Sequence, residues 1–356
     1  MSDADSPYLD AMAAVRPVHS RSYAAAIEYQ QRLTKPVGSL GDLEEIGAQL
    51  SAIAGQMPPP LPVPAAVAVF AGDHGVARSG VTPWPQEVTG QMVANFLNGG
   101  AAINVFARQV GAPVTVVDVG VAALLEPQAG LRRAKVAFGT RDLSIGPAMS
   151  RDEVLLALNV GTETAADLVT EGARCLISGD MGIGNTTASA ALIAAFTGRR
   201  ASEVTGRGTG IDDQTLARKT EIVETALARL APNSDPMQVM AEVGGLEIAA
   251  LAGFMIGGAA FQIPVIIDGV IALAAACFVQ QVSPIALGYV IAGHRSTEPG
   301  ASVALHHLGL RPLIDLHLRL GEGTGACLAY PLVQAAARVL REMATFDSAG
   351  VIDKRD

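Results

Sequence analysis

The chain has 356 residues, of which 50% are hydrophobic and 17% are charged, and its formal net charge is −9. This composition supplies a large buried core for one or two domains, and it excludes a basic surface of the kind that follows nucleic-acid phosphates. The three cysteines lie far apart with no paired spacing, so we expect a reducing, cytoplasmic compartment and no disulfide framework. The acidic start, MSDADSPYLD, is not typical of a signal peptide.

Both ends of the chain are predicted to be helical. Residues 7–57 have helical patterning with a break at 35–38, and the proline run at 57–62 predicts a stiff linker. A long helix with a basic last turn is predicted after Gly325. We therefore expect a small helical lobe from residues 1–60 and 326–356, and an α/β catalytic domain from residues 61–325.

Six short apolar runs each end in glycine and one or two polar residues, at 67–75, 114–120, 175–185, 263–269, 288–296 and 316–325. Helical patterns separate or follow them, at 86–109, 151–172, 186–197, 213–230, 239–261 and 270–282. This alternation predicts an α/β fold in which a mostly parallel, Rossmann-like sheet is flanked by helices.

Parallel sheets bind ligands beyond the carboxyl ends of their strands, so the polar residues of these loops are predicted to share one crevice. They are Asp73, His74, Asp118, Asp180, Asn185, Asp268, His294, Arg295, Ser296 and Glu322. Each loop taken alone also fits an ordinary strand-end turn, where glycine and aspartate are favoured. Six such loops together favour a site.

Two uncharged stretches, 248–267 and 269–293, are long enough to span a bilayer. Pro264 interrupts the first, and the polar residues and proline at 280–284 interrupt the second. We therefore expect helix, strand, helix and strand buried inside an α/β domain, and no membrane partner. A membrane permease is the alternative for this region.

The loop at 179–187, GDMGIGNTT, lies between a predicted strand and an alanine-rich helix. Its glycines let the backbone approach a ligand, and the N–H groups at a helix start favour an anion. It matches neither the Walker A pattern nor GxGxxG, so on its own it fits a phosphate site and a plain tight turn equally. A second glycine loop at 205–210 precedes the helix with Lys219, which is either a cation for the same anion or part of a solvated face.

Glu322 is a lone carboxylate among glycines in the run LGEGTG at 320–325. Apolar neighbours would raise its pKa, which suits a general base, whereas a helix-capping or salt-bridged glutamate is the alternative. The histidines have no metal-ligand spacing, His317 is expected on a strand face, and no GxSxG motif is present. We therefore expect no metal site and no hydrolase triad.

A series of motifs closely resembles the nicotinate-nucleotide–dimethylbenzimidazole phosphoribosyltransferase family. In chain order they are KPVGSLG at 35–41, DHGV at 73–76, EVT at 87–89, DVG at 118–120, GIGNTT at 182–187, Lys219, VGG at 243–245, PV and DG at 264–269, and LGEGTG at 320–325. The resemblance runs from about residue 30 to 345. It implies a homodimer, a Rossmann-like sheet with a helical lobe from both chain ends, and no metal or organic cofactor.

The resemblance also implies small-molecule substrates and a reaction. The 5-phosphoribosyl group of nicotinate mononucleotide would pass to 5,6-dimethylbenzimidazole, giving α-ribazole 5′-phosphate and nicotinate, with Glu322 as the catalytic base. A nucleotide N-glycosidase and a non-catalytic nucleotide-binding protein are the alternative functions.

Carried over by position, the resemblance assigns two groups of substrate-binding residues. The phosphoribosyl and nicotinate group would contact Asp180, Gly182, Gly184, Asn185, Thr186, Gly206, Gly208, Lys219 and Ser296. The benzimidazole would contact Trp84, Pro85, Val88, Met92 and Leu320. Two positions depart from the family pattern: Asp180 stands where glutamate is frequent, and Trp84 stands where smaller residues also occur. Arg295 matches no family feature.

Overall fold

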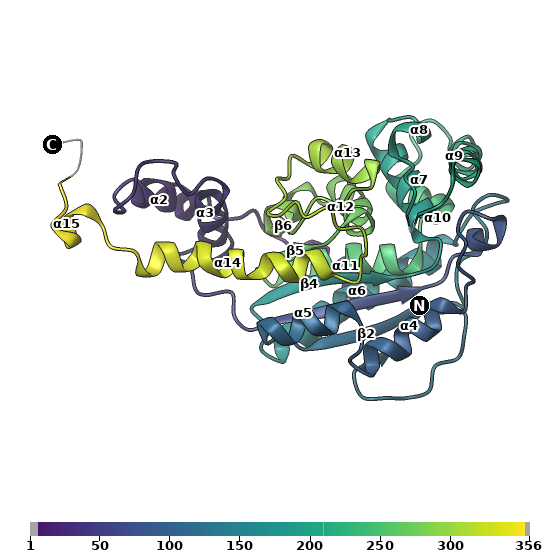
Figure 1. The fold of residues 1–356 in the computed structure, drawn as a ribbon, viewed down its shortest axis with the longest axis horizontal. Helices are drawn as coiled ribbons and strands as arrows, with labels where there is room; N and C mark the ends of the chain where they lie inside the picture. The colour runs from purple at the N-terminus through teal and green to yellow at the C-terminus, as the bar shows by residue number, and fades with distance from the viewer. Residues whose placement is uncertain (1–5, 209, 353–356) are drawn as a thin grey trace.

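In the part of the chain that the structure describes, six parallel strands form one sheet (Figure 1). The computed structural model describes residues 6–208 and 210–352. The strands are β1 (Ala65–Gly72), β2 (Val114–Gly120), β3 (Leu131–Arg133), β4 (Cys175–Met181), β5 (Val265–Ile267) and β6 (Val290–Ala292). Their order is β3-β2-β1-β4-β5-β6, so the chain starts in the middle, builds one edge and then returns to build the other. The predicted parallel, Rossmann-like sheet is confirmed, and its topological switch point lies between β1 and β4.

The central strands are largely apolar because both faces of the sheet are covered. All eight residues of β1 are buried. Ala66, Ala68 and Phe70 point into one core cluster, whereas Val67 and Val69 point into another on the opposite face. Alternate residues of one strand therefore stabilise two helical layers, as buried parallel strands require.

The helices form a layer on each face of the sheet (Figure 1). In chain order the α-helices are α1 (Pro7–Ala14), α2 (Ser20–Gln30), α3 (Asp42–Ala54), α4 (Val88–Leu97), α5 (Ala102–Val110), α6 (Arg151–Thr170), α7 (Asn185–Thr197), α8 (Ala201–Val204), α9 (Asp213–Leu227), α10 (Pro236–Val243), α11 (Leu246–Ala260), α12 (Val270–Val282), α13 (Pro299–Leu308), α14 (Thr324–Glu342) and α15 (Phe346–Ala349). The 3-10 helix η2 (Gly75–Ser79) follows β1, and the 3-10 helix η3 (Pro284–Tyr289) precedes β6.

The uncharged stretch at 248–267 is buried in the interior of this domain. α11 packs closely on α6 through Gly161 and Gly253: a Cβ on Gly161 would lie 1.8 Å from the carbonyl oxygen of Ala250. Phe254 of α11 meets Phe70 of β1 edge to face, with ring centroids 5.3 Å apart. Within the described residues, no helix has both the length and the apolar character needed to cross a membrane.

One of the six predicted strands is wrong. The run at 316–325 is a loop followed by α14. The N–H groups of Leu313 and Ile314 bond to the carbonyl oxygens of Ala292 and Gly293, and the carbonyl oxygen of Leu318 accepts the N–H of Thr297. Leu316 and Leu320 are 58% and 57% exposed, so no helical layer covers this segment. His317 lies in the same exposed loop with φ +56°, not on a strand face. The sixth strand is instead β3, whose three residues pair with β2 at the sheet edge.

Two predicted helices are broken by glycine pairs. The stretch at 86–109 divides at Gly99-Gly100 into α4 and α5, and the stretch at 239–261 divides at Gly244-Gly245 into α10 and α11. Glycine is the weakest helix former apart from proline, so each pair permits a sharp change of direction.

The two ends of the chain meet through α3, which packs against both α2 and α14. α14 begins near the carboxyl end of β5, packs on β4 and β5, and runs out to α2 and α3 (Figure 1). α1, by contrast, packs against α6 and α11 of the α/β body. The division into a lobe of residues 1–60 and 326–356 and a domain of residues 61–325 stays a prediction, and residues 1–5 and 353–356 lie outside the described residues.

Candidate functional site

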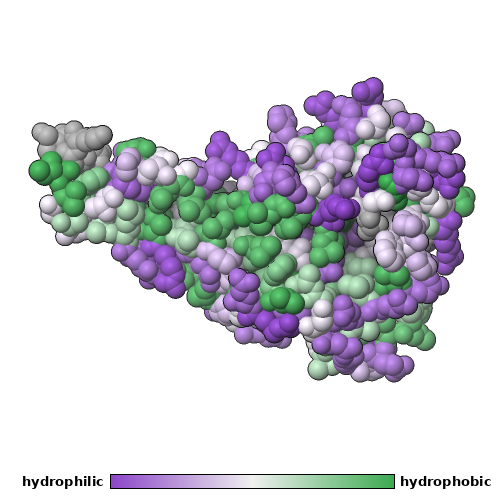
Figure 2. All heavy atoms as spheres, viewed as in Figure 1, coloured by the Kyte–Doolittle hydropathy of each residue, from purple (hydrophilic) through white to green (hydrophobic). Residues whose placement is uncertain are grey.

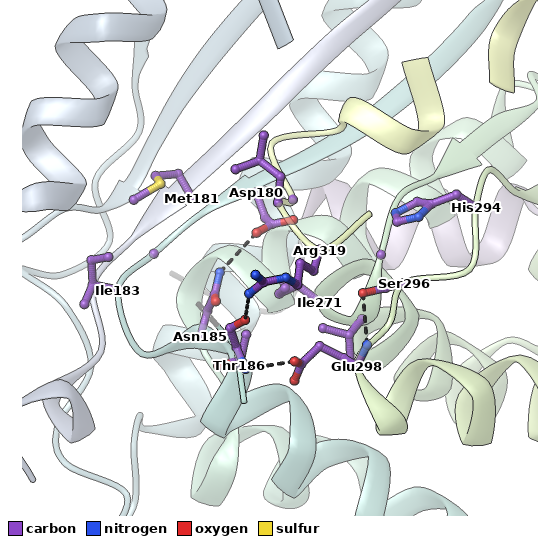
Figure 3. Close-up of a pocket in the computed structure, with 16 residues that line it drawn as sticks. Asp180, Met181, Ile183, Asn185, Thr186, Ile271, His294, Ser296, Glu298 and Arg319 are labelled. Carbon is purple, nitrogen blue, oxygen red and sulfur yellow. Dashed lines mark hydrogen bonds between the residues drawn. The ribbon is translucent and has the colours of Figure 1, made fainter. Parts of the chain in front are cut away.

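A crevice opens at the carboxyl ends of β4, β5 and β6 (Figure 3). Its empty volume is about 620 Å³, part of which is open to solvent. Eight of the predicted site residues line it: Asp180, Gly182, Asn185, Thr186, Gly208, His294, Ser296 and Leu320. Strand-end loops far apart in sequence therefore do meet, as the sheet rule predicts.

The loop after β4 forms one wall of the crevice. It leads through Gly184, which has φ +98°, into α7 at Asn185. A Cβ on Gly182 would lie 2.2 Å from the carbonyl oxygen of Gly72, so only glycine fits between β4 and β1 there. Asn185 turns back to donate its Nδ2 to Oδ2 of Asp180, 3.1 Å away. The start of α7 faces the cavity and is suited to an anion.

Two cations flank this loop. Lys219 of α9 is 1% exposed, and its Nζ donates to Oγ1 of Thr186 at 2.8 Å and to the carbonyl oxygen of Gly206 at 3.0 Å. Burial lowers the pKa of Lys219 to about 8, against the opposing effect of Glu298. Arg319 lines the cavity and donates to the carbonyl oxygen of Gly208 at 3.3 Å (Figure 3). An anion bound at the start of α7 would meet positive charge from both.

Sequence reasoning missed Glu298 and Arg319. Glu298 is 7% exposed and accepts the N–H of Gly208 at 2.8 Å, which holds the second glycine loop against the crevice. It occupies the N-cap position of α13, immediately before Pro299, which was an available signal. Arg319 lies inside the run at 316–325, whose pattern predicts a strand. Thr209 of the second glycine loop lies outside the described residues.

Glu322 lies in an unusual backbone turn at the start of α14. Gly321, Glu322 and Gly323 have φ values of +82°, +64° and +90°, a conformation that glutamate rarely adopts. The carboxylate of Asp268 holds the turn: Oδ2 accepts the N–H of Gly323 at 3.2 Å, and Oδ1 accepts the N–H of Ala326 at 3.0 Å. Strain of this kind persists where the surroundings enforce it, often at functional sites.

The side chain of Glu322 reaches the start of another helix. It is 4% exposed, and its Oε2 accepts the N–H of Ile103 in the first turn of α5, 3.2 Å away. The N-cap residue of α5, Ala101, has no side-chain acceptor to offer, so Glu322 supplies one. Burial raises the pKa of Glu322, the Ile103 N–H lowers it, and nearby Asp268 raises it, with a net rise. The geometry thus gives Glu322 a capping role and a proton affinity suited to a base.

Further buried titratable groups lie around the turn. Burial, together with Asp268, Glu247 and Glu322, raises the pKa of Asp180 well above its usual range. His74 and Glu247, both fully buried, form a pair with Nε2 and Oε1 2.5 Å apart. His294 Nε2 lies 3.3 Å from Oδ1 of Asp268.

The remaining predicted residues lie behind or beyond the cavity lining. Gly184, Gly206, Lys219 and Glu322 adjoin lining residues. Trp84, Pro85, Val88 and Met92 do not line the cavity: they belong to α4 and the segment before it. Asp118 pairs with Lys135 and Arg295 with Asp315, each at 2.9 Å, and neither lines the cavity. Over residues 6–208 and 210–352, no group of three or more His, Cys, Asp or Glu side chains is placed to hold a metal ion.

Anion binding at this loop should depend on pH through Lys219. With a pKa of about 8, its ammonium loses its charge as the pH rises through that value. Orthophosphate loses no negative charge over this range, so any weakening must come from the protein. We expect calorimetry to show orthophosphate binding about tenfold weaker at pH 9 than at pH 7. Equal or tighter binding at pH 9 would remove Lys219 from the anion site.

Comparisons with known proteins find relatives that match almost the whole chain. A family model described as "Phosphoribosyltransferase" matches residues 15–351. The nicotinate-nucleotide–dimethylbenzimidazole phosphoribosyltransferase of Salinispora tropica is 57% identical over 96% of this chain and 98% of its own. The enzyme of the same name from Chloroflexus aurantiacus is 53% identical over 96% and 97%. The crystal structure of CobT from Thermus thermophilus superposes with a TM-score of 0.91 at 49% identity, covering 93% of this chain and 99% of that one.

Proposed function

The chain belongs to the nicotinate-nucleotide–dimethylbenzimidazole phosphoribosyltransferase family, and we propose that its reaction takes place in the crevice between the 182–187 loop and Glu322. As a pentosyltransferase it moves the 5-phosphoribosyl group of nicotinate mononucleotide to 5,6-dimethylbenzimidazole, which gives α-ribazole 5′-phosphate and nicotinate. The observation that carries the proposed location is the junction of an anion-binding loop with a buried, raised-pKa carboxylate. Gly321 lines the cavity and immediately precedes Glu322.

The phosphate of nicotinate mononucleotide is assigned to the start of α7. Thr186, Gly208 and Ser296 line that part of the cavity. Lys219 lies behind Thr186, and its Nζ donates a hydrogen bond to the Thr186 hydroxyl. A phosphate there would replace the Thr186 hydroxyl as a partner of the Lys219 ammonium, or share it. Charge-assisted hydrogen bonds of this kind fix the ribose relative to the protein.

The chemistry at the anomeric carbon needs a base and no acid. The leaving pyridine nitrogen already carries a positive charge, so nicotinate departs with the bonding electron pair and needs no proton. One benzimidazole nitrogen attacks the anomeric carbon, and positive charge spreads over the ring. The N–H of the other nitrogen becomes acidic, and the Glu322 carboxylate takes that proton. Oε2 keeps its bond to the Ile103 N–H while Oε1 accepts the proton.

Orientation of the two bound partners supplies much of the rate. Attack on the face opposite the departing ring converts the β-linked substrate into an α-linked product. Holding both reactants in line removes a bimolecular entropy cost, a term worth up to ~7–11 kcal/mol in favourable cases. The stiff turn at 321–323 suits this role because it fixes the base relative to the loop.

The benzimidazole is assigned to the space between Leu320 and the segment that carries Trp84, Pro85, Val88 and Met92. Leu320 is 57% exposed and Trp84 is 50% exposed, so both have apolar surface to offer a flat ring. An aromatic pair would add ~0.5–1.5 kcal/mol beyond burial.

Trp84 is the only tryptophan, which makes this assignment directly measurable. We expect dimethylbenzimidazole to quench or shift the protein's fluorescence saturably. Trp84→Ala should raise the KM for dimethylbenzimidazole several-fold, because stacking is lost, and leave the KM for nicotinate mononucleotide nearly unchanged. Fluorescence that ignores saturating benzimidazole, with unaltered kinetics in the variant, would place Trp84 outside the slot.

Product analysis separates transfer from the alternative functions. Incubation with nicotinate mononucleotide alone should release almost no nicotinate, and addition of dimethylbenzimidazole should start the release. A nucleotide N-glycosidase would release nicotinate and ribose 5-phosphate without the second substrate. A non-catalytic nucleotide-binding protein would bind the mononucleotide and release nothing in either case.

A homodimer in a reducing, cytoplasmic compartment completes the proposal. Figure 2 shows a broad apolar band over α14 and α5. Val105 of α5 is 50% exposed there, and Phe106 and Leu332 are partly exposed. Exposed apolar bands of this kind mark interaction surfaces. All three cysteines are unpaired, which supports the compartment. We further propose that α2, α3 and α14 form the core of the lobe assigned to residues 1–60 and 326–356.

A further inference from the structure

Thr89 joins the two substrate regions through one hydrogen bond. It lies in the first turn of α4 and is fully buried. Its Oγ1 accepts the backbone N–H of Ile183, 3.1 Å away, although the two residues are 94 positions apart. Ile183 lines the crevice in the middle of the loop that precedes α7. The bond therefore connects α4 with the proposed phosphate loop.

The neighbours of Thr89 give this bond its importance. Val88 precedes it, and Met92 lies one turn further along α4, so the residues assigned to the benzimidazole flank the threonine. On the other side, Gly182 and Gly184 flank Ile183. The bond between Thr89 and Ile183 thus lies between the two groups of residues.

Few other restraints act at this junction. α4 buries Thr89, Val93 and Phe96 but leaves most of its remaining surface exposed or half-exposed. The floor of the loop is held separately: a Cβ on Gly184 would lie 3.2 Å from Cβ of His74, and one on Gly182 would lie 3.3 Å from Oε1 of Glu247. The His74–Glu247 pair packs closely beneath the loop, whereas Thr89 bonds the loop to α4.

Thr89 also approaches the end of β1. Burial raises the pKa of Asp73, and the Ala122 N–H and the Thr89 hydroxyl hold it down. Asp73 is 2% exposed. The buried oxygen of Thr89 accepts the Ile183 N–H, which valine of the same shape cannot do.

We infer that Thr89 is a positioning residue that sets the spacing between the phosphate loop and the benzimidazole slot. Without the Thr89 oxygen, α4 is no longer bonded to the phosphate loop. Each substrate must then bring the residues of its own subsite into position when it binds. The inference rests on the proposed function, because the two subsites are assigned there.

The test compares Thr89→Val and Thr89→Ser with two reference variants. In Thr89→Val the KM values for both substrates should rise together, by about 5- to 30-fold, since an unpaired buried N–H is a costly defect. Thr89→Ser keeps the oxygen and should stay within about twofold of the unchanged protein. Met92→Ala should raise only the KM for dimethylbenzimidazole. Thr164→Val removes another buried hydroxyl, which bonds only to the Val160 carbonyl oxygen of its own helix, and should change neither KM.

Calorimetric titration with orthophosphate and with dimethylbenzimidazole reports the same effect without turnover. Thr89→Val should weaken the binding of both ligands. This binding measurement decides the inference even if the unchanged protein forms no product. Absence of product would contradict the proposed function and leave the role of Thr89 to be decided by binding. A change in only one ligand, or a serine variant as impaired as the valine variant, would overturn the role of Thr89. If the valine variant does not fold, Thr89→Ala replaces it, with the same expected pattern.

Discussion

Glu322→Gln is expected to lower kcat by about 10²- to 10⁴-fold, the usual contribution of a general base. Glutamine keeps the shape of the side chain, and its amide oxygen can still accept the N–H of Ile103, so the cap on α5 is retained. It cannot take the benzimidazole proton. The KM values for both substrates should therefore change by no more than a few-fold.

The pH profile of the same variant gives an independent check. Burial raises the pKa of Glu322 above the ordinary value of 4.5. The unchanged enzyme should lose kcat as the pH falls through this raised pKa, because the carboxylate becomes protonated. In Glu322→Gln the acid limb should disappear. Near-normal turnover in the variant, or an unchanged acid limb, would transfer the base role to another group, with Asp180 the first to test.

Lys219→Met is expected to raise the KM for nicotinate mononucleotide by about 10- to 150-fold. A hydrogen bond to a charged group is worth ~1.5–3 kcal/mol, which corresponds to that range. Methionine fills a similar volume but leaves Glu298 without its cation. The KM for dimethylbenzimidazole should change by less than about threefold, because no charge of that ligand is neutralised by Lys219.

Arg319→Met provides the comparison for this variant. Arg319 is exposed and bonds to a backbone carbonyl of the second glycine loop, so its removal should cost less than the removal of the buried lysine. Equal increases in both KM values in Lys219→Met would indicate general disruption of α9 rather than loss of a phosphate contact. A larger loss in Arg319→Met than in Lys219→Met would reverse the assignment of the principal cation.

The architecture was predictable because its signals are local. Strands buried on both faces appear as apolar runs, and the loops that follow them need glycine and polar residues whatever the rest of the chain does. β3 was missed because Leu131–Arg133 has two arginines in three residues and becomes a strand only by pairing with β2. The run at 316–320 alternates between leucine and polar residues as a strand does. Its leucines would be buried only under a layer of helices, and among the described residues no helix covers Leu316 or Leu320.

The site was predictable only in part, for the same reason. The 182–187 loop and Glu322 carry local glycine signals, and Lys219 was found through the family resemblance. Glu298 and Arg319 belong to residue types that are usually solvated, so only the tertiary structure shows one buried against Gly208 and the other on the cavity wall. The bond between Glu322 and Ile103 spans 219 positions, and no sequence pattern indicates it.

The anomeric configuration of the product tests the central claim most directly. The protein is incubated with nicotinate mononucleotide and dimethylbenzimidazole, and the nucleotide product is examined by mass spectrometry and by proton NMR of the ribose. We predict an α-linked dimethylbenzimidazole ribonucleotide 5′-phosphate formed in equal amount with nicotinate, because attack opposite the leaving ring inverts the anomeric carbon. A β-linked nucleotide, or ribose 5-phosphate with no nucleotide, would contradict direct transfer between two partners held in this crevice.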